Sequence, residues 1–237
     1  MDNFSNTPER RHVQDVSAVN SFLTKTYIIM AISVLVSALT SYLSTTVFKP
    51  ELVSLFSNRA SSWIIIFLPF VLSLIIGFRA TRNQVASFIM LMIVAMSYGL
   101  TFAVICSAYT VGTVTSAFVS AAAVFITMAV YGTVTKRDLT NVGSYATAAL
   151  IGFIVATIIN MFLKNPMVTY IFAYIGVIIF TALTASDAQQ IKKVYTQYAD
   201  QTSSLGLAVL GALQLYLDFT NIFMFFLEIF GMGGDNR

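Results

Sequence analysis

Long runs of apolar residues, interrupted by few charged side chains, form the dominant pattern of this chain. A helix needs about 20 apolar residues to cross the roughly 30 Å hydrocarbon layer of a bilayer, so charge-free stretches mark candidate spans. The stretch 83–135 is too long for one span, and its polar segment 107–116 predicts a turn between two. The pattern therefore predicts seven spans: 26–47, 60–78, two within 83–135, 139–163, 168–186 and about 205–230.

The fold class that follows is an all-α polytopic membrane protein of seven transmembrane helices. The apolar runs are far longer than barrel strands and lack strict alternation, which excludes a β-barrel. The chain divides into an N-terminal tail (1–22), a seven-helix domain (23–231) and a short C-terminal tail (232–237). Because the first 20 residues are polar and the apolar run starts only after Lys25, no cleavable signal peptide is predicted.

The basic residues are distributed unequally between the two faces that seven spans would create. One face collects nine: Arg10, Arg11, Lys25, Arg79, Arg82, Lys136, Arg137, Lys192 and Lys193. The other has four: Lys49, Arg59, Lys164 and Arg237. Since basic residues prefer the cytoplasmic side, this bias predicts a cytoplasmic N-terminus and an outward C-terminus.

Composition excludes several classes of function. Hydrophobic side chains make up 57% of the chain and charged ones only 10%, so the lipid bilayer is the first expected partner. With 13 Lys and Arg against 10 Asp and Glu there is no strongly basic surface, and no nucleic-acid partner is expected. The single Cys106 and single His12 exclude an internal disulfide and His-rich zinc or haem sites, so no cofactor is expected.

Three acids, Asp187, Asp218 and Glu228, lie near or inside predicted spans, where a charge costs roughly 2.5 to 3.5 kcal/mol. The segment 189–198 keeps helical spacing, so the sixth span should continue as an amphipathic helix to a turn at 200–204. Both aspartates are about 15 residues, or roughly 23 Å of helix, from the middle of that turn. An antiparallel hairpin would therefore bring Asp187 and Asp218 to the same depth.

Polar residues around these acids fall on helical stripes that should face protein or water. The stripe on the seventh span contains Gln214, Asn221 and Glu228, and the one on the sixth contains Thr184 and Gln190. These five residues are the candidate pore-lining groups. Two carboxyl groups held together at low dielectric should share one proton, which predicts a proton switch. Arg79, at the end of the second span, could latch the pair through a bidentate hydrogen bond.

Four segments resemble the Bax inhibitor-1 (transmembrane BAX inhibitor motif) family. Residues 210–231 read LGALQLYLDFTNIFMFFLEIFG and are similar to the closing signature of that family. Residues 173–193 resemble its sixth helix, 131–140 the connection between its fourth and fifth helices, and 98–110 its third helix. The resemblance is closest to the bacterial, YccA-like branch, which favours a bacterial inner (plasma) membrane.

The resemblance implies a central seventh helix surrounded by the other six. It also implies a pH-sensitive calcium leak governed by an aspartate pair, which matches Asp187 and Asp218. These would then be transient Ca²⁺ ligands, and Arg79 would match the basic residue that ends the second helix. Two departures concern gating detail: Ser186 stands where the family often has an aromatic residue, and the second span contains Pro69 and no acid.

Other functional classes stay open or are excluded. A non-conducting regulator would bind other membrane proteins, such as a membrane-bound AAA protease or cell-death and stress partners. The aspartates could instead only staple neighbouring helices, Glu228 could be a solvated helix end, and Arg79 could only follow the positive-inside bias. No enzymatic activity is predicted, because the Gly-x-Gly-Asp signature of intramembrane aspartyl proteases is missing before both aspartates. A retinal photoreceptor is excluded because the seventh span has no Lys for a Schiff base.

Overall fold

The computed structural model describes residues 16–80, 82–199 and 203–234, and these residues form helices without any strand. The helices are α1 (Val16–Thr46), α2 (Lys49–Ser57), α3 (Arg59–Arg79), α4 (Gln84–Cys106), α5 (Val111–Val134), α6 (Thr140–Leu163), α7 (Pro166–Tyr198) and α8 (Ser204–Gly234). Seven of them, all except α2, are long and apolar enough to cross a membrane. The predicted all-α, seven-span class is confirmed.

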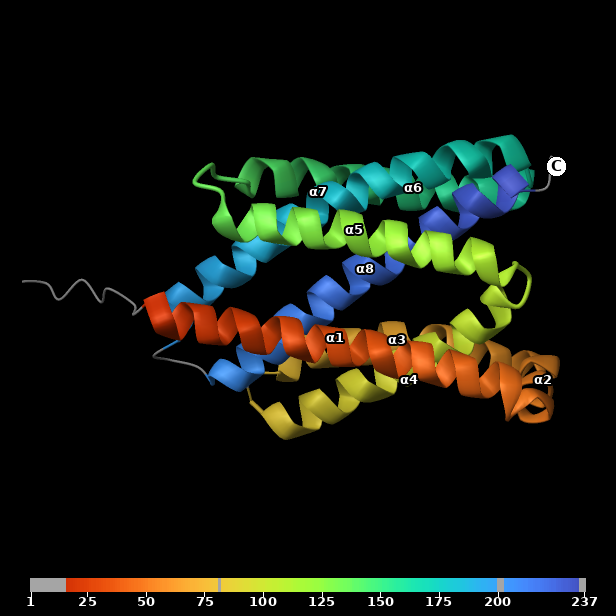
Figure 1. The fold of residues 1–237 in the computed structure, drawn as a ribbon, viewed down its shortest axis with the longest axis horizontal. Coiled ribbons are helices and arrows are strands. Elements are labelled where there is room, and N and C mark those ends of the chain that lie inside the picture. The colour runs from red at the N-terminus through yellow and green to blue at the C-terminus, as the bar shows by residue number, and fades with distance from the viewer. Residues whose placement is uncertain (1–15, 81, 200–202, 235–237) are drawn as a thin grey trace, which may run out of the picture.

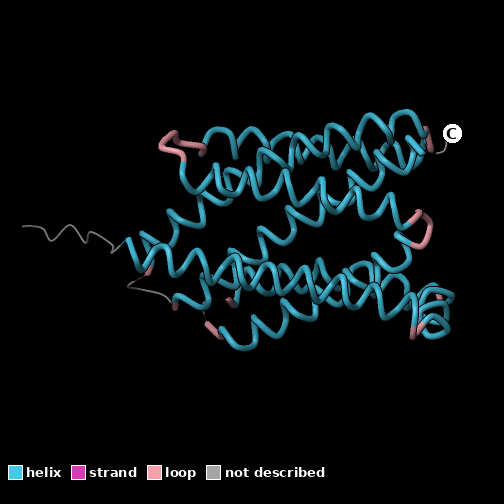
Figure 2. Tube along the Cα trace, viewed as in Figure 1, coloured by secondary structure: helices cyan, strands magenta, loops and turns pink. Residues whose placement is uncertain are grey.

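Short polar residues begin most of the spanning helices. The side chains of Asn58, Asn83, Thr110 and Asn165 each accept a hydrogen bond from a backbone N–H in the first turn of the following helix. These bonds satisfy amide groups that have no partner within the helix. Short connections join the helices (Figure 2).

Element boundaries differ from the predicted spans in three places. α1 begins at Val16, ten residues before the predicted start of the span. The predicted turn at 107–116 is shorter, because α5 already begins at Val111. The nine-residue helix α2 was not predicted at all; Pro50 lies in its first turn, where the missing N–H costs nothing.

The long hairpin of α7 and α8 agrees with the prediction. α7 continues without interruption to Tyr198, well beyond the predicted end of the span at Ser186. α8 begins at Ser204, so most of the predicted turn at 200–204 lies outside the described residues. The two helices run antiparallel along one another (Figure 1).

α8 crosses between two groups of helices, α1–α3–α4 on one side and α5–α6–α7 on the other (Figure 1). It is the most buried span, and it packs mainly against α7, α5 and α1. The prediction that six helices surround it is not confirmed, because α3 packs mainly on α4 and α6 mainly on α7.

Successive helices alternate in direction, so the connections lie at two opposite ends of the bundle. The α3–α4, α5–α6 and α7–α8 connections share the end where α1 begins (Figure 1). We call this the basic end, because Arg82, Lys136, Arg137, Lys192 and Lys193 lie at or near it. The described chain starts at the basic end and finishes at the opposite one, as the seven-span topology requires.

Candidate functional site

The α7–α8 hairpin brings Asp187 and Asp218 together. Asp187 of α7 and Asp218 of α8 lie close enough for each carboxyl group to act on the other electrostatically, and Gln214 of α8 lies beside Asp187. All three residues come from the stripes that the sequence predicts on these two helices. The juxtaposition follows from the near-equal distance of the two aspartates from the hairpin turn.

The two carboxyl groups occupy different environments. Asp218 is 5% exposed, and its Oδ2 has no hydrogen-bond partner among the described residues. Asp187 is half-buried and lines a cavity of about 330 Å³ between α6 and α7. That cavity continues past Gln190 to Lys193 and Gln197, toward the basic end. One member of the pair is therefore enclosed in the core, while the other forms part of the wall of a polar cavity.

The remaining residues of the two polar stripes differ in their exposure and in their hydrogen-bond partners. Gln190 is exposed and lines the same cavity as Asp187. Thr184 is fully buried, and its hydroxyl donates to the Phe180 carbonyl of its own helix (2.7 Å). Asn221 likewise donates to the Leu217 carbonyl (2.7 Å). The Thr184 hydroxyl hydrogen and one of the two Asn221 amide hydrogens are thus used within their own helices.

Two predicted residues lie away from the pair or cannot be related to it. Glu228 is half-buried two to three turns farther along α8, near Tyr109 of the α4–α5 connection. Arg79 ends α3, but its side chain lies outside the part of the chain that the structure describes. The predicted latch between Arg79 and the aspartate pair is therefore not tested by this geometry.

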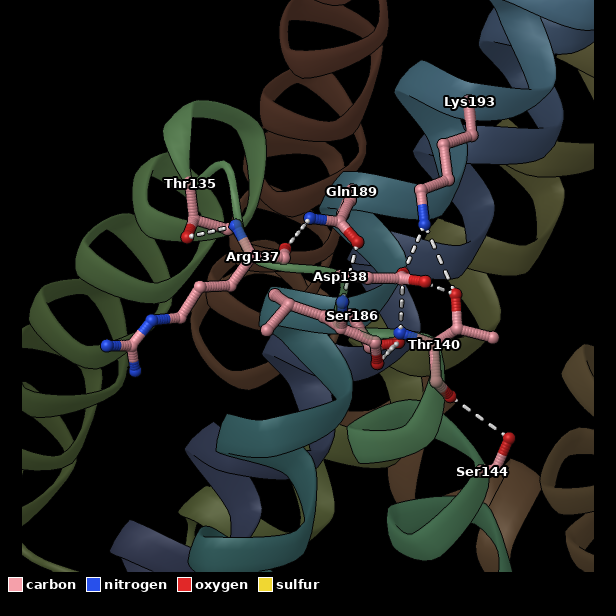
Figure 3. Close-up of polar contacts among 9 residues, drawn as sticks. Thr135, Arg137, Asp138, Thr140, Ser144, Ser186, Gln189 and Lys193 are labelled. Carbon is pink, nitrogen blue, oxygen red and sulfur yellow. Dashed lines mark hydrogen bonds and ion pairs between the residues drawn. The ribbon is translucent and has the colours of Figure 1, made fainter.

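A polar cluster beside Asp187 was not predicted. Gln189 donates through Nε2 to the Arg137 carbonyl and accepts from the Leu139 amide at Oε1, both at 2.8 Å (Figure 3). The Ser186 hydroxyl donates to the Leu139 carbonyl (3.4 Å). A single turn of α7 therefore holds the backbone of the α5–α6 connection on both sides of Asp138.

Two lysines extend this attachment. Lys192 Nζ donates to the Thr133 carbonyl (2.9 Å), where α5 ends and a cation is favourable. Lys193 Nζ lies 2.6 Å from Asp138 Oδ1 and 3.2 Å from Thr140 Oγ1 (Figure 3). The hydrogen bonds from Lys193 and Thr140 hold the pKa of Asp138 well below its usual range. We call Ser186, Gln189, Lys192 and Lys193 the loop clamp.

The loop clamp and the acidic pair are parts of the same stretch of α7. Ser186 precedes Asp187 directly, and Gln189 follows two residues later. A shift of α7 at Asp187 would therefore also act on the hydrogen bonds that hold the α5–α6 connection. The sequence offered one signal for this contact: four of the five residues 189–193 are polar or basic. The helical spacing of this segment predicts only an amphipathic extension of the sixth span.

Close helix contacts reinforce the same region. A Cβ on Gly132 of α5 would clash with the Ala185 carbonyl of α7, and one on Gly143 of α6 would clash with the Ser186 hydroxyl. The α5–α7 and α6–α7 crossings therefore depend on glycine where they meet the two residues that directly precede Asp187. Small residues at such crossings are typical of helix packing in membranes.

Comparison with known proteins relates the whole bundle to one family. A family model described as "Inhibitor of apoptosis-promoting Bax1" matches residues 19–235. An uncharacterized membrane protein of Streptococcus pyogenes serotype M3 is 38% identical over 224 residues, covering 93% of this chain and 96% of the relative. YrjE of Lactococcus lactis is 34% identical, with 94% and 96% covered. The inner membrane protein YbhL of Escherichia coli K12 is 34% identical, with 92% and 94% covered.

Proposed function

The chain belongs to the Bax inhibitor-1 (YccA-like) family of multi-pass membrane proteins, and from this premise we propose that it is a pH-sensitive calcium leak channel. The closeness of Asp187 and Asp218 across the α7–α8 hairpin is the observation that carries the proposal. Acids inside a membrane are costly, and they are typical of ion and proton pathways. The proposal includes no enzymatic step.

Protonation of the pair is the proposed gate. Two carboxyl groups can hydrogen-bond to each other only when at least one holds a proton, because an ionised carboxylate has no donor. In the paired state, the shared proton links α7 to α8. The cavity between α6 and α7 gives protons access to Asp187 from the basic end. A change in protonation therefore acts directly on the α7–α8 contact.

Calcium is the proposed permeant ion. Ca²⁺ binds oxygen ligands, carbonyl oxygens included, and the carboxyl oxygens of Asp187 and Asp218 would be transient ligands along its path. Gln190 and Asp187 line the same cavity, and Gln214 of α8 lies beside Asp187. In this mechanism a cationic latch such as Arg79 would bind the negative charge of the singly protonated pair and keep the channel closed. A second proton removes that charge and releases the latch. Acidification therefore raises the calcium flux.

The test is calcium flux into proteoliposomes with an enclosed Ca²⁺ reporter across pH 5 to 8. We expect flux of the unmodified protein to rise as the pH falls, and Asp187→Asn, Asp218→Asn and the double variant to lose most of this pH dependence. Asp138→Asn is the matched control, since it removes an aspartate that pairs with Lys193 of α7 and leaves Asp187 and Asp218 unchanged. If the three variants of the pair kept the same pH profile as the unmodified protein and the Asp138→Asn control, the pair would be excluded as the sensor.

The family description favours a second candidate, a regulator that binds other membrane proteins without conducting ions. The partner would be a membrane-bound protease or a cell-death or stress protein. The same proteoliposomes separate the two: no flux at any pH, together with a stable partner purified from membranes, would support the regulator.

The proposed setting is a bacterial inner membrane with the basic end in the cytoplasm. The relative YbhL is named an inner membrane protein. Basic residues at the ends of short connections favour the cytoplasmic side.

A further inference from the structure

A second polar cavity, of about 410 Å³, lies on the other side of the loop clamp. It is bounded by the end of α5, the α5–α6 connection and α7, and it opens to the surface of the bundle. Its lining includes four cationic side chains and one acid: Lys136, Arg137, Lys192, Lys193 and Asp138. We call it the basic pocket.

The charges of the basic pocket are only partly compensated. Lys193 is paired with Asp138, and Lys192 is bound to the Thr133 carbonyl at the end of α5. The side chains of Lys136 and Arg137 are exposed and have no hydrogen bond or ion pair to any described residue. In Figure 3 the Arg137 guanidinium points away from the clamp residues. The cavity therefore has an excess of positive charge and two cations available for a ligand.

We propose that the basic pocket binds a phosphate group, presented either by an anionic lipid headgroup or by a free phosphate-bearing anion. Arg137 offers a planar fork that matches phosphate oxygens, and Lys136 adds a compact charge beside it. The backbone of this connection is already held by Gln189 at two points, so the pocket wall is organised before any ligand arrives. This inference does not depend on ion conduction.

The position of the pocket suits a lipid headgroup. It lies where α5 ends, level with the other connections of the basic end, and thus beside the ends of the apolar spans. Basic pockets between transmembrane helices at a membrane surface are known to hold anionic headgroups. The general preference of basic residues for the cytoplasmic face does not explain why four of them line one pocket. Lys25 and Arg82 lie at the same face but do not line the pocket.

The experiment compares two double variants of the full-length protein. Lys136→Gln/Arg137→Gln removes the two uncompensated cations of the pocket, whereas Lys25→Gln/Arg82→Gln removes the same charge from the same face outside it. Each protein is placed in nanodiscs of phosphatidylcholine with or without 20% phosphatidylglycerol, and retained lipid is counted by native mass spectrometry. Inorganic phosphate is titrated separately into the phosphatidylcholine nanodiscs, and binding is followed by phosphorus NMR.

We expect retained phosphatidylglycerol to fall roughly 10- to 30-fold in the pocket variant and to stay unchanged in the control variant. Binding of inorganic phosphate without retained lipid, lost in the same variant, would also support the pocket and assign it to a free anion. Equal losses in the two variants would overturn the proposal in favour of diffuse surface attraction. Absence of both ligands from the unmodified protein would overturn it as well. All these proteins must elute as monodisperse species, which separates lost binding from lost folding.

Discussion

At the residue scale, two buried side-chain oxygens of the described residues lack a hydrogen-bond partner, Asp218 Oδ2 and Asn160 Oδ1, and only Asp218 is an acid. The fully buried Tyr216 hydroxyl lies 2.6 Å from that of Ser37, which donates in turn to the Ala95 carbonyl (2.8 Å). This network ties α8 to α1 and α4. Asp218, two residues from Tyr216, keeps one oxygen without a partner among the described residues. A buried polar group without a partner costs stability, so a functional role explains its presence better than helix stapling does.

The Asp138–Lys193 pair leads to a pH prediction with a definite sign. Because the pKa of Asp138 is lowered in the folded protein, its contribution to stability is present above the ordinary value of about 3.8. That contribution disappears only as the pH falls below this value. We expect the difference in thermal stability between the unmodified protein and Asp138→Asn to be constant from pH 8 to pH 5 and to shrink below about pH 4.

Thermal unfolding in detergent at several pH values measures this difference, with Asp138→Glu as the variant that keeps the charge. A difference that shrinks between pH 8 and 5 would contradict the prediction. A constant difference would also show that Asp138 does not change its protonation state between pH 8 and 5. Effects of pH on flux in that range would then not arise from its titration.

A side-chain contact could be predicted from the sequence only where the residue pattern of one hairpin contained the information. The pairing of Asp187 with Asp218 could be predicted because both lie at equal distances from one turn. The contact of Gln189 with Leu139 could not, because the partner is a backbone amide 50 residues away. No periodicity in a single sequence encodes which loop a glutamine will meet.

At the element scale, the length of the apolar runs predicted the seven spans, and helical spacing predicted the polar extension of α7, whereas the short helix α2 was not predicted. α7 was expected to extend as an amphipathic helix because residues 189–198 keep helical spacing. α2 was missed because its nine residues are too short to span the membrane and mix charged with apolar groups. Hydropathy detects burial in lipid, and it says little about helices that lie outside the hydrocarbon layer.

Close packing at the α5–α7 crossing provides an element-level prediction. A Cβ at Gly132 would clash with backbone atoms of Ala185, which cannot move without shifting α7. We expect Gly132→Ala to destabilise the bundle by about 1–3 kcal/mol and to loosen the loop clamp. Gly152→Ala on α6 is the matched control, because an added Cβ there meets nothing within 4 Å. Reversible unfolding in mixed detergent measures both, and equal stabilities of the two variants would contradict the packing argument.

At the scale of the whole molecule, α8 is the main connection between the two helix groups. Two apolar cavities, of about 440 and 500 Å³, separate α1 from α5 along part of α8. Contact between the groups is therefore made largely through α8 and its hairpin partner α7. A change at Asp218 is thus placed to affect both groups, whereas a change in α3 or α6 would act on one.

Orientation in the membrane is the last property that the charge distribution predicts, and it decides which compartment supplies protons to Asp187. We replace the native Cys106 with Ala and introduce single cysteines at two exposed positions, Arg82 at the basic end and Ser107 at the opposite end. In spheroplasts, a membrane-impermeant maleimide should label Ser107→Cys at once and Arg82→Cys only after permeabilisation, because basic connections stay in the cytoplasm. Labelling of both cysteines after permeabilisation is the control for reactivity. The reversed order would place the cavity beside Asp187 outside the cell, and the proposed channel would then sense external rather than cytoplasmic pH.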